Sequence, residues 1–204
     1  CELMWMLAKR YGYNSKGTVL EPSLGTGNFL KWAPDLSKCY GFEINPVSKR
    51  ICEILYPEAK IYEGYFETAF LKAPRFTERL KSSLTWLGGY PFSLVIGNPP
   101  YGKYKNMYSS YFPKPKMHQI ELFFMYYSLK LLKPGGLLIV GLDFYEENKV
   151  SHSWPHDCDI SIMRLMSEKT WVKMFKQAGF KNVNSLRFGA KKDWAGTLIL
   201  KGIK

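Results

Sequence analysis

Paired cysteines, long apolar runs and internal repeats are all missing from this 204-residue chain. Its four cysteines form no Cys-x-x-Cys pair, which fits a reducing compartment better than a disulfide-stapled secreted domain, so we expect four free thiols. The chain has no run of about 18 apolar residues that could span a bilayer, and no basic-then-apolar leader opens it. We therefore expect a soluble, cytoplasmic protein with no membrane partner.

Acidic residues are also scarce. The chain has 17 Asp and Glu against 29 Lys and Arg, a formal charge of +12, and residues 101–204 contribute +9 of it. This excess disfavours a basic partner and favours an acidic polymer such as nucleic acid. Because 46% of the residues are hydrophobic, we expect one domain with one core over residues 1–204. The chain opens at Cys1, inside an expected helix and without an initiator Met, so we interpret it as a fragment or a processed chain.

Short apolar runs alternate with helical patterns along the chain. The clearest strand is 92–97, a continuous apolar run of the kind expected for a strand buried on both faces. A helix over 118–132 should stop at Lys133-Pro-Gly-Gly, and Ser167 should cap a helix that runs to Gly179. Further strands are expected at 18–22, 38–43, 60–62, 137–142, 183–187 and 196–200, and further helices at 1–10, 29–32 and 47–56.

This alternation predicts an α/β fold, a doubly wound, mainly parallel, seven-stranded sheet. In such a sheet a ligand binds outside the carboxyl ends of the strands, where the strand order reverses. We expect this crevice at the ends of the first and fourth strands.

A glycine-rich turn follows the first strand. In Glu21-Pro-Ser-Leu-Gly-Thr-Gly27 a backbone without Cβ atoms can approach a ligand ahead of a helix. Residue 30 is Leu, so the spacing is not that of a dinucleotide-binding loop, and no Gly-Lys-Ser/Thr follows as in a P-loop. Glu43 ends the next strand, where an acid can accept hydrogen bonds from ribose hydroxyls. The alternative is that Glu43 only caps the helix that opens at Pro46. The two carboxylates suit a ligand with a ribose and a cationic amino group.

The turn Asn98-Pro-Pro-Tyr101 directly follows the buried strand. Two prolines fix the backbone, so the Asn98 amide and its neighbouring carbonyls are aimed into the crevice. The Asn98 side-chain oxygen and the Pro99 carbonyl can both accept hydrogen bonds from a planar amino group, and Tyr101 offers an aromatic face to a base. The alternative is a stiff structural turn without a chemical role.

Together these two segments resemble the class I S-adenosylmethionine-dependent methyltransferases. Residues 21–29 are similar to the first motif of the DNA adenine methyltransferases, and residues 96–101 resemble the (D/N/S)-P-P-(Y/F) catalytic motif of the amino-methyltransferases, in the order of the gamma group. The resemblance covers roughly residues 2–142. It implies S-adenosylmethionine as the cofactor, the 6-amino group of adenine in DNA as the acceptor, and a role in restriction-modification.

The resemblance also implies roles for single residues. In that family the loop and its first acid hold the methionine part of the cofactor, the second acid holds the ribose, and the catalytic Asn and Tyr hold the extruded base. Where the family often has an acid that binds the cofactor adenine, this chain has Tyr65, so no acid is expected there, and Tyr65 and Phe66 are expected only to line the site. The implied catalytic residues are Asn98, Pro99, Pro100 and Tyr101; the implied cofactor-binding residues are Glu21, Pro22, Gly25, Gly27, Asn28, Phe29, Glu43, Ile44, Tyr65 and Phe66.

The stretch 101–116 carries four Lys, five aromatic residues and no acid. Lysines neutralise phosphates and aromatic rings stack on bases, so this stretch is predicted to bind nucleic acid through Lys103, Tyr104, Lys105 and Tyr108. The alternative is a solvated loop. After about residue 143 the chain resembles small-substrate methyltransferases instead and leaves no room for a target-recognition domain, so a separate domain or subunit is an expected partner.

Three other functions fit the same residues. An RNA adenine methyltransferase of minimal size would need no recognition domain. A protein glutamine methyltransferase uses the same turn, since a carboxamide is also a planar amino group. A non-catalytic cofactor-binding subunit would keep only the fold. His152, His156 and Cys158 match no standard zinc spacing, so we expect no metal there.

Overall fold

The computed structural model describes residues 1–67, 92–98, 120–157 and 165–204. Its centre is a seven-stranded sheet with the order β3-β2-β1-β4-β5-β7-β6. Neighbouring strands are parallel except where β7 pairs with β5 and β6. The predicted doubly wound, mainly parallel sheet is confirmed. The strands are β1 (Thr18–Glu21), β2 (Cys39–Glu43), β3 (Lys60–Glu63), β4 (Phe92–Gly97), β5 (Leu132–Leu142), β6 (Lys181–Phe188) and β7 (Thr197–Ile203).

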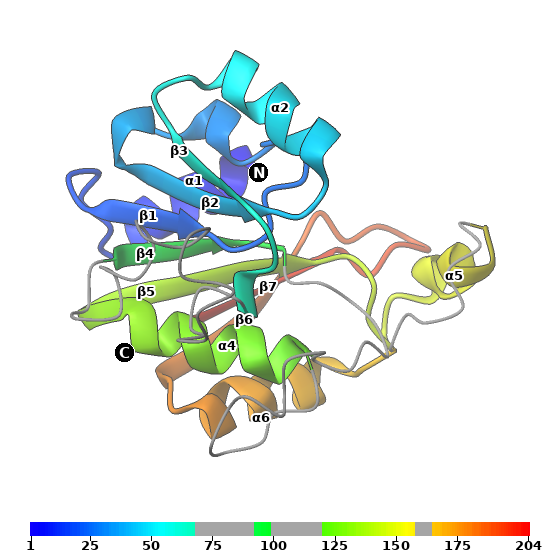
Figure 1. Ribbon diagram of the computed structural model, residues 1–204. Coiled ribbons are helices and arrows are strands. Elements are labelled where there is room, and N and C mark those ends of the chain that lie inside the picture. Colours follow the sequence, from blue (N-terminus) through cyan, green and yellow to red (C-terminus); the bar gives the residue numbers. More distant parts are fainter. Residues whose placement is uncertain (68–91, 99–119, 158–164) are drawn as a thin grey trace.

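Helices cover both faces of the sheet (Figure 1). One face carries α1 (Glu2–Arg10), α2 (Pro46–Leu55) and the 3-10 turns η1 (Leu30–Trp32) and η2 (Leu36–Lys38); the other carries α4 (Ile120–Leu131) and α6 (Glu168–Ala178). The core accordingly forms two clusters, because successive side chains of a strand point to opposite faces. The turn η6 (Lys149–Ser153) and the short helix α5 (Trp154–Asp157) lie beyond the carboxyl end of β5. No helix in the described ranges is both long enough and apolar enough to cross a membrane.

The helix ends follow the local sequence. The Asn45 side-chain oxygen accepts hydrogen bonds from the N–H groups of Val47 and Ser48, and Pro46 occupies the first helical position of α2. The Ser167 hydroxyl accepts one from Thr170, as predicted for α6. Gly179 ends that helix with a φ of +105°, a conformation that glycine adopts without strain.

Two predicted elements differ. The helix expected at 29–32 is only the 3-10 turn η1, because Ala33 precedes Pro34 and adopts an extended backbone. Strand β5 begins at Leu132, five residues earlier than expected. Phe92 pairs with Leu132 and Leu94 pairs with Leu137, so residues 133–136 form a bulge within the strand. The predicted helix breaker, residues 133–136, therefore lies inside β5, where it interrupts the pairing with β4 but does not move the start of the strand.

Candidate functional site

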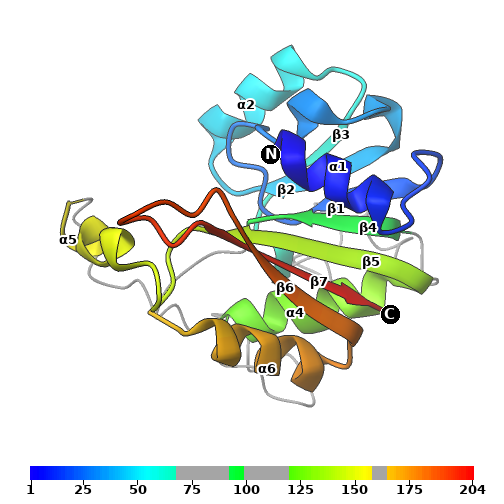
Figure 2. The same cartoon turned by 180° about the vertical axis from the view of Figure 1, so that it is seen from behind.

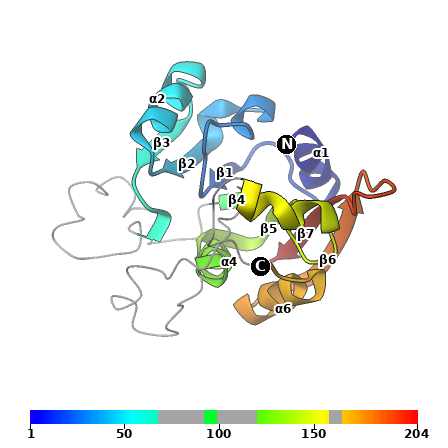
Figure 3. The ribbon, with the colours of Figure 1, turned by 90° about the vertical axis from the view of Figure 1, so that its right-hand side faces the viewer.

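The order of the sheet reverses at β1, which has β2 on one side and β4 on the other. Both β1 and β4 end at the carboxyl edge, which faces the viewer in Figure 3. A Cβ atom placed on Gly97 would lie 3.6 Å from the Cγ atom of Glu21, so the Glu21 side chain passes directly beside the end of β4. Glu21 and Gly97, the residue before Asn98, therefore lie side by side at the position predicted for the crevice.

The Glu43 carboxylate ties the glycine loop to the start of α2. One oxygen accepts a hydrogen bond from the Gly25 N–H and the other accepts one from the Asn45 N–H, both at 2.7 Å. Asn45, not Glu43, caps the first turn of α2. Glu43 is 7% exposed, so a ligand that replaced either hydrogen bond would meet a desolvated carboxylate.

The two loop glycines have different surroundings. Gly25 has a φ of +55°, and a Cβ atom there would meet nothing within 4 Å. Gly27 has a φ of +78°, and a Cβ atom there would lie 2.7 Å from the Tyr56 ring and 3.0 Å from the Cys52 sulfur. The backbone at Gly25 therefore faces open space that a ligand can enter, whereas Gly27 packs against α2.

Glu21 is a buried acid with an unused oxygen. Its side chain is 3% exposed, and no described residue donates a hydrogen bond to Oε2. Burial raises the pKa of Glu21 well above its usual value, and the nearby Glu43 carboxylate raises it further. A cationic hydrogen-bond donor brought to this oxygen would satisfy it and would stabilise its ionised form.

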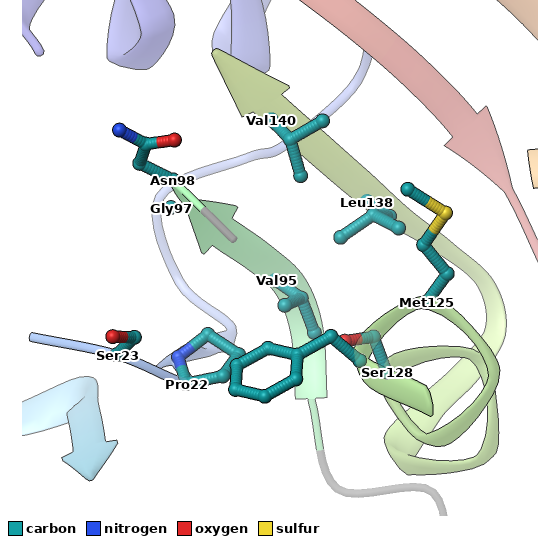
Figure 4. A pocket seen from close by; sticks show the side chains of 10 residues that line it. Pro22, Ser23, Val95, Gly97, Asn98, Met125, Ser128, Leu138 and Val140 are labelled. Carbon is teal, nitrogen blue, oxygen red and sulfur yellow. The ribbon is translucent and has the colours of Figure 1, made fainter. Parts of the chain in front are cut away.

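A pocket lies between the end of β1, the end of β4 and helix α4 (Figure 4). Its atom-free space is about 310 Å³, open mouth included. Pro22 and Asn98, predicted from separate motifs, both line it, and Asn98 is exposed. The pocket is lined by Pro22, Ser23, Val95, Gly97, Asn98, Phe124, Met125, Ser128, Leu138 and Val140.

Sequence reasoning missed the contribution of α4 to this pocket, because apolar residues at helical spacing over 118–132 indicate core packing alone. Phe124, Met125 and Ser128 of α4 line the pocket, and Figure 4 shows Met125 and Ser128 on the side of that helix. Ser128 is 2% exposed. Two polar residues, Glu121 and Ser128, are among the buried residues of α4, and polar residues in an apolar helix were the signal that could have indicated a lining role.

Of the other residues predicted to bind the cofactor, some are exposed and can contact a ligand, and others are buried in the core. Asn28, Ile44 and Tyr65 are exposed, and Ile44 is a large apolar side chain with 48% of its surface open next to Glu43. Phe29 is buried, and its carbonyl accepts a hydrogen bond from the Trp5 indole at 2.8 Å. Phe66 is 2% exposed and packs against core aromatic rings, so it offers almost no surface to a ligand.

Several predictions fall on residues outside the described ranges: Pro99, Pro100, Tyr101, Lys103, Tyr104, Lys105, Tyr108 and Cys158. The three described cysteines, Cys1, Cys39 and Cys52, are free thiols. Within the described ranges no group of three or more His, Cys, Asp or Glu could hold a metal ion.

Comparison with known proteins gives matches in sequence and in fold. Residues 37–149 match the Eco57I restriction-modification methylase family. The chain is 31% identical over 139 residues to the defense against restriction protein B of Escherichia phage P1; the match covers 68% of this chain and 6% of that protein. The chain therefore spans a small part of the length of this curated relative.

Solved structures of methyltransferases share the fold. The 1,6-didemethyltoxoflavin-N1-methyltransferase of Burkholderia thailandensis, solved with S-adenosylhomocysteine, superposes with a TM-score of 0.60 at 13% identity, covering 98% of this chain and 76% of that one. The methyltransferase in complex with the Trm112 methyltransferase activator of Haloferax volcanii superposes with a TM-score of 0.63 at 18% identity, covering 98% and 89%.

Proposed function

The chain belongs to the Eco57I restriction-modification methylase family, and on this premise we propose that it transfers the methyl group of S-adenosylmethionine to the exocyclic 6-amino group of adenine in DNA. One observation carries the proposal. The Glu21 side chain, whose buried Oε2 has no hydrogen-bond partner among the described residues, passes beside the end of β4, where the Asn98 side chain lines an apolar pocket. The acid suited to the cofactor, Glu21, and the amide suited to the acceptor base, Asn98, therefore lie together at the carboxyl edge of the sheet.

The residues at this edge fit S-adenosylmethionine. The unpartnered Oε2 of Glu21 suits the cationic amino group of the methionine part, and the Glu43 carboxylate suits the ribose hydroxyls. Ile44 and Tyr65 expose the apolar and aromatic surface that an adenine ring needs. When bound, the cofactor supplies an electrophilic methyl group on a sulfonium.

Asn98 acts on the acceptor. Its side-chain oxygen accepts a hydrogen bond from the amino group of the base, which leaves the nitrogen lone pair directed toward the methyl group. Asn98 is exposed in the free chain, and a base that fills the pocket against apolar side chains such as Pro22 and Val140 would exclude water and strengthen this hydrogen bond. No strong general base is needed, because the proton can leave to water after the nitrogen has been methylated. Positioning supplies most of the acceleration.

DNA is the proposed polymer because the family is one of restriction-modification methylases and the chain carries a formal charge of +12. The target sequence would be read by a separate domain or subunit, since the matched relative is far longer than this chain. The stretch containing Lys103, Tyr104, Lys105 and Tyr108 remains the proposed contact to the extruded base.

Methyl transfer from isotopically labelled S-adenosylmethionine tests the proposal. Duplex DNA, single-stranded DNA, structured RNA and a protein extract are incubated separately, digested and analysed by mass spectrometry. We expect label on the 6-amino group of adenine in DNA. The Asn98→Ala variant should lose at least about 100-fold in rate with its cofactor affinity retained, whereas Asn184→Ala, on the exposed strand β6, should match the wild type.

Each other outcome is informative. Label on RNA or on glutamine would replace DNA adenine as the acceptor. Cofactor binding without label on any acceptor would contradict the proposed activity of this chain and favour a cofactor-binding subunit.

A further inference from the structure

The proposed reaction does not use the charge at the amino edge of the sheet, opposite the pocket. Residues 122–142, 169–192 and 194–204 together hold eleven Lys and Arg and no Asp or Glu. Several of these residues lie where β5, β6 and β7 meet two helix ends. Figure 2 shows β7 ending beside the start of β5, at the side of the molecule away from α5.

Five lysines form what we call the amino-edge cluster: Lys130, Lys133, Lys176, Lys181 and Lys204. Lys130 ends α4, Lys133 follows the first residue of β5, and Lys176 lies in the last turn of α6. Lys181 opens β6 and pairs with Ile203, the neighbour of Lys204. The Lys204 ammonium donates to the carbonyls of Lys130 and Leu132 at 3.3 and 2.6 Å, which joins the cluster across the sheet.

Helix dipoles account for only part of this cluster. Lys130 and Lys176 are in the last turns of their helices, where a cation is favourable. Lys133 and Lys181 lie on strands, and both are exposed. Burial lowers the pKa of Lys204, and the charge of Lys130 lowers it further, so these ammonium groups repel one another. A polyanion bound here would relieve that repulsion.

We propose that the amino-edge cluster binds the phosphate backbone of a second stretch of duplex DNA, away from the target base. This inference rests on the proposed function, because it takes DNA as the polymer. Lysine ammonium groups on flexible stems neutralise regularly spaced phosphates without reading sequence. Asn98 directly follows Gly97, and Gly97 pairs with Val140 near the carboxyl end of β5. Lys133 lies at the opposite end of that strand, so one straight duplex placed across the pocket would not cover it. The cluster tethers the enzyme to DNA while the other edge searches for its base.

The salt dependence of binding to a long duplex, without cofactor, tests this. The variant Lys133→Gln/Lys181→Gln is compared with Lys38→Gln/Lys60→Gln, which removes the same charge from exposed positions where β2 and β3 begin, at the other end of the strand order from the cluster. Each lost phosphate contact reduces the slope of log affinity against log salt by about 0.9. We expect the cluster variant to lose nearly two such contacts and the control to lose less than half as much.

Methylation of a short single strand that carries the target adenine is the second measurement. It should be unchanged in the cluster variant, because that substrate does not reach the amino edge. Equal slopes for the two variants would overturn the inference, and so would poly-glutamate that binds as tightly as DNA of equal charge. Active DNA methylation together with equal slopes would reject the cluster and leave the proposed function intact.

Discussion

The loop after β1 and the segment between β6 and β7 both rely on buried polar side chains at the carboxyl edge, but they use them in opposite ways. In the loop, Glu21 keeps a carboxylate oxygen without a partner among the described residues. Near the segment 189–196, Tyr145 and Asn148 are fully buried, and all their side-chain polar atoms are hydrogen-bonded. The Tyr145 hydroxyl lies 2.8 Å from the Gly196 carbonyl, and Asn148 donates to the Asp143 carbonyl at 2.8 Å and accepts from Ala195 at 3.3 Å.

This difference separates a binding region from a supporting region. Nearly all buried polar groups in proteins are hydrogen-bonded, since an unmet one costs free energy. A satisfied pair such as Tyr145 and Gly196 fixes the backbone and needs no ligand. An unmet carboxylate such as Glu21 destabilises the free protein and is compensated when a cation arrives. Substitutions in the loop should therefore change ligand affinity most, and substitutions near 189–196 should change stability alone.

The largest effect is expected for Glu43→Gln. The carboxylate accepts from two N–H groups at 2.7 Å, and glutamine would place an NH₂ donor against one of them. Cofactor affinity, measured by titration calorimetry with S-adenosylhomocysteine, should fall about 100-fold, or roughly 2.7 kcal/mol. The control is Glu53→Gln on α2, which loses the partly exposed ion pairs with Lys49 and Arg50 and should change stability by less than about 0.5 kcal/mol. If the affinity of Glu43→Gln for S-adenosylhomocysteine stayed within threefold of wild type, the glycine loop held by Glu43 would not be part of the cofactor site.

Alanine substitutions at the two loop glycines should have different effects on stability and on cofactor binding. Gly27→Ala places a methyl group 2.7 Å from the Tyr56 ring at a positive φ, so the free energy of unfolding should fall by about 2 kcal/mol in a urea titration. Gly25→Ala meets nothing within 4 Å and should lose only about 1 kcal/mol for its positive φ, with a larger loss of cofactor affinity. If both variants lost equal stability and bound the cofactor equally well, the open space beside Gly25 would not be where the cofactor binds.

Tyr145→Phe tests the supporting region. The substitution leaves the Gly196 carbonyl without its buried donor, so the free energy of unfolding should fall by about 1.5 kcal/mol. Cofactor affinity should stay within twofold of wild type, because the hydroxyl bonds only backbone of the segment 189–196. A tenfold loss of affinity without loss of stability would place Tyr145 in the ligand site and remove the contrast between the two regions.

The sequence was sufficient for the parts of the fold that depend on local pattern. The strand 92–97, the opening of α2 at Pro46 and the Ser167 cap of α6 were predicted because their signals lie within a few residues. The bulge at 133–136 was not, since it depends on how β5 aligns with Phe92 across the sheet. The α4 side of the pocket was missed for the same kind of reason. Ser128 becomes a lining residue only through the packing of α4 beside β4 and β5.

The smallest effect, and the one that links stability to binding, is expected for Glu21→Gln. The raised pKa of Glu21 means that the folded chain favours the protonated carboxyl, whereas the unfolded chain ionises at the usual pKa of Glu. The contribution of Glu21 to stability is therefore complete below that usual pKa and is lost as the pH rises toward the raised one. In Glu21→Gln this loss disappears, so the variant should be more stable than wild type at neutral pH, by an amount on the order of 1 kcal/mol. The difference between the two melting temperatures, followed from acid to neutral pH, isolates Glu21 from other titrating groups. With S-adenosylhomocysteine the sign should reverse, since the ligand ammonium favours the ionised carboxylate that only the wild type has. A difference that does not change with pH or with ligand would mean that the unpartnered oxygen of Glu21 neither costs the free protein stability nor binds the cofactor.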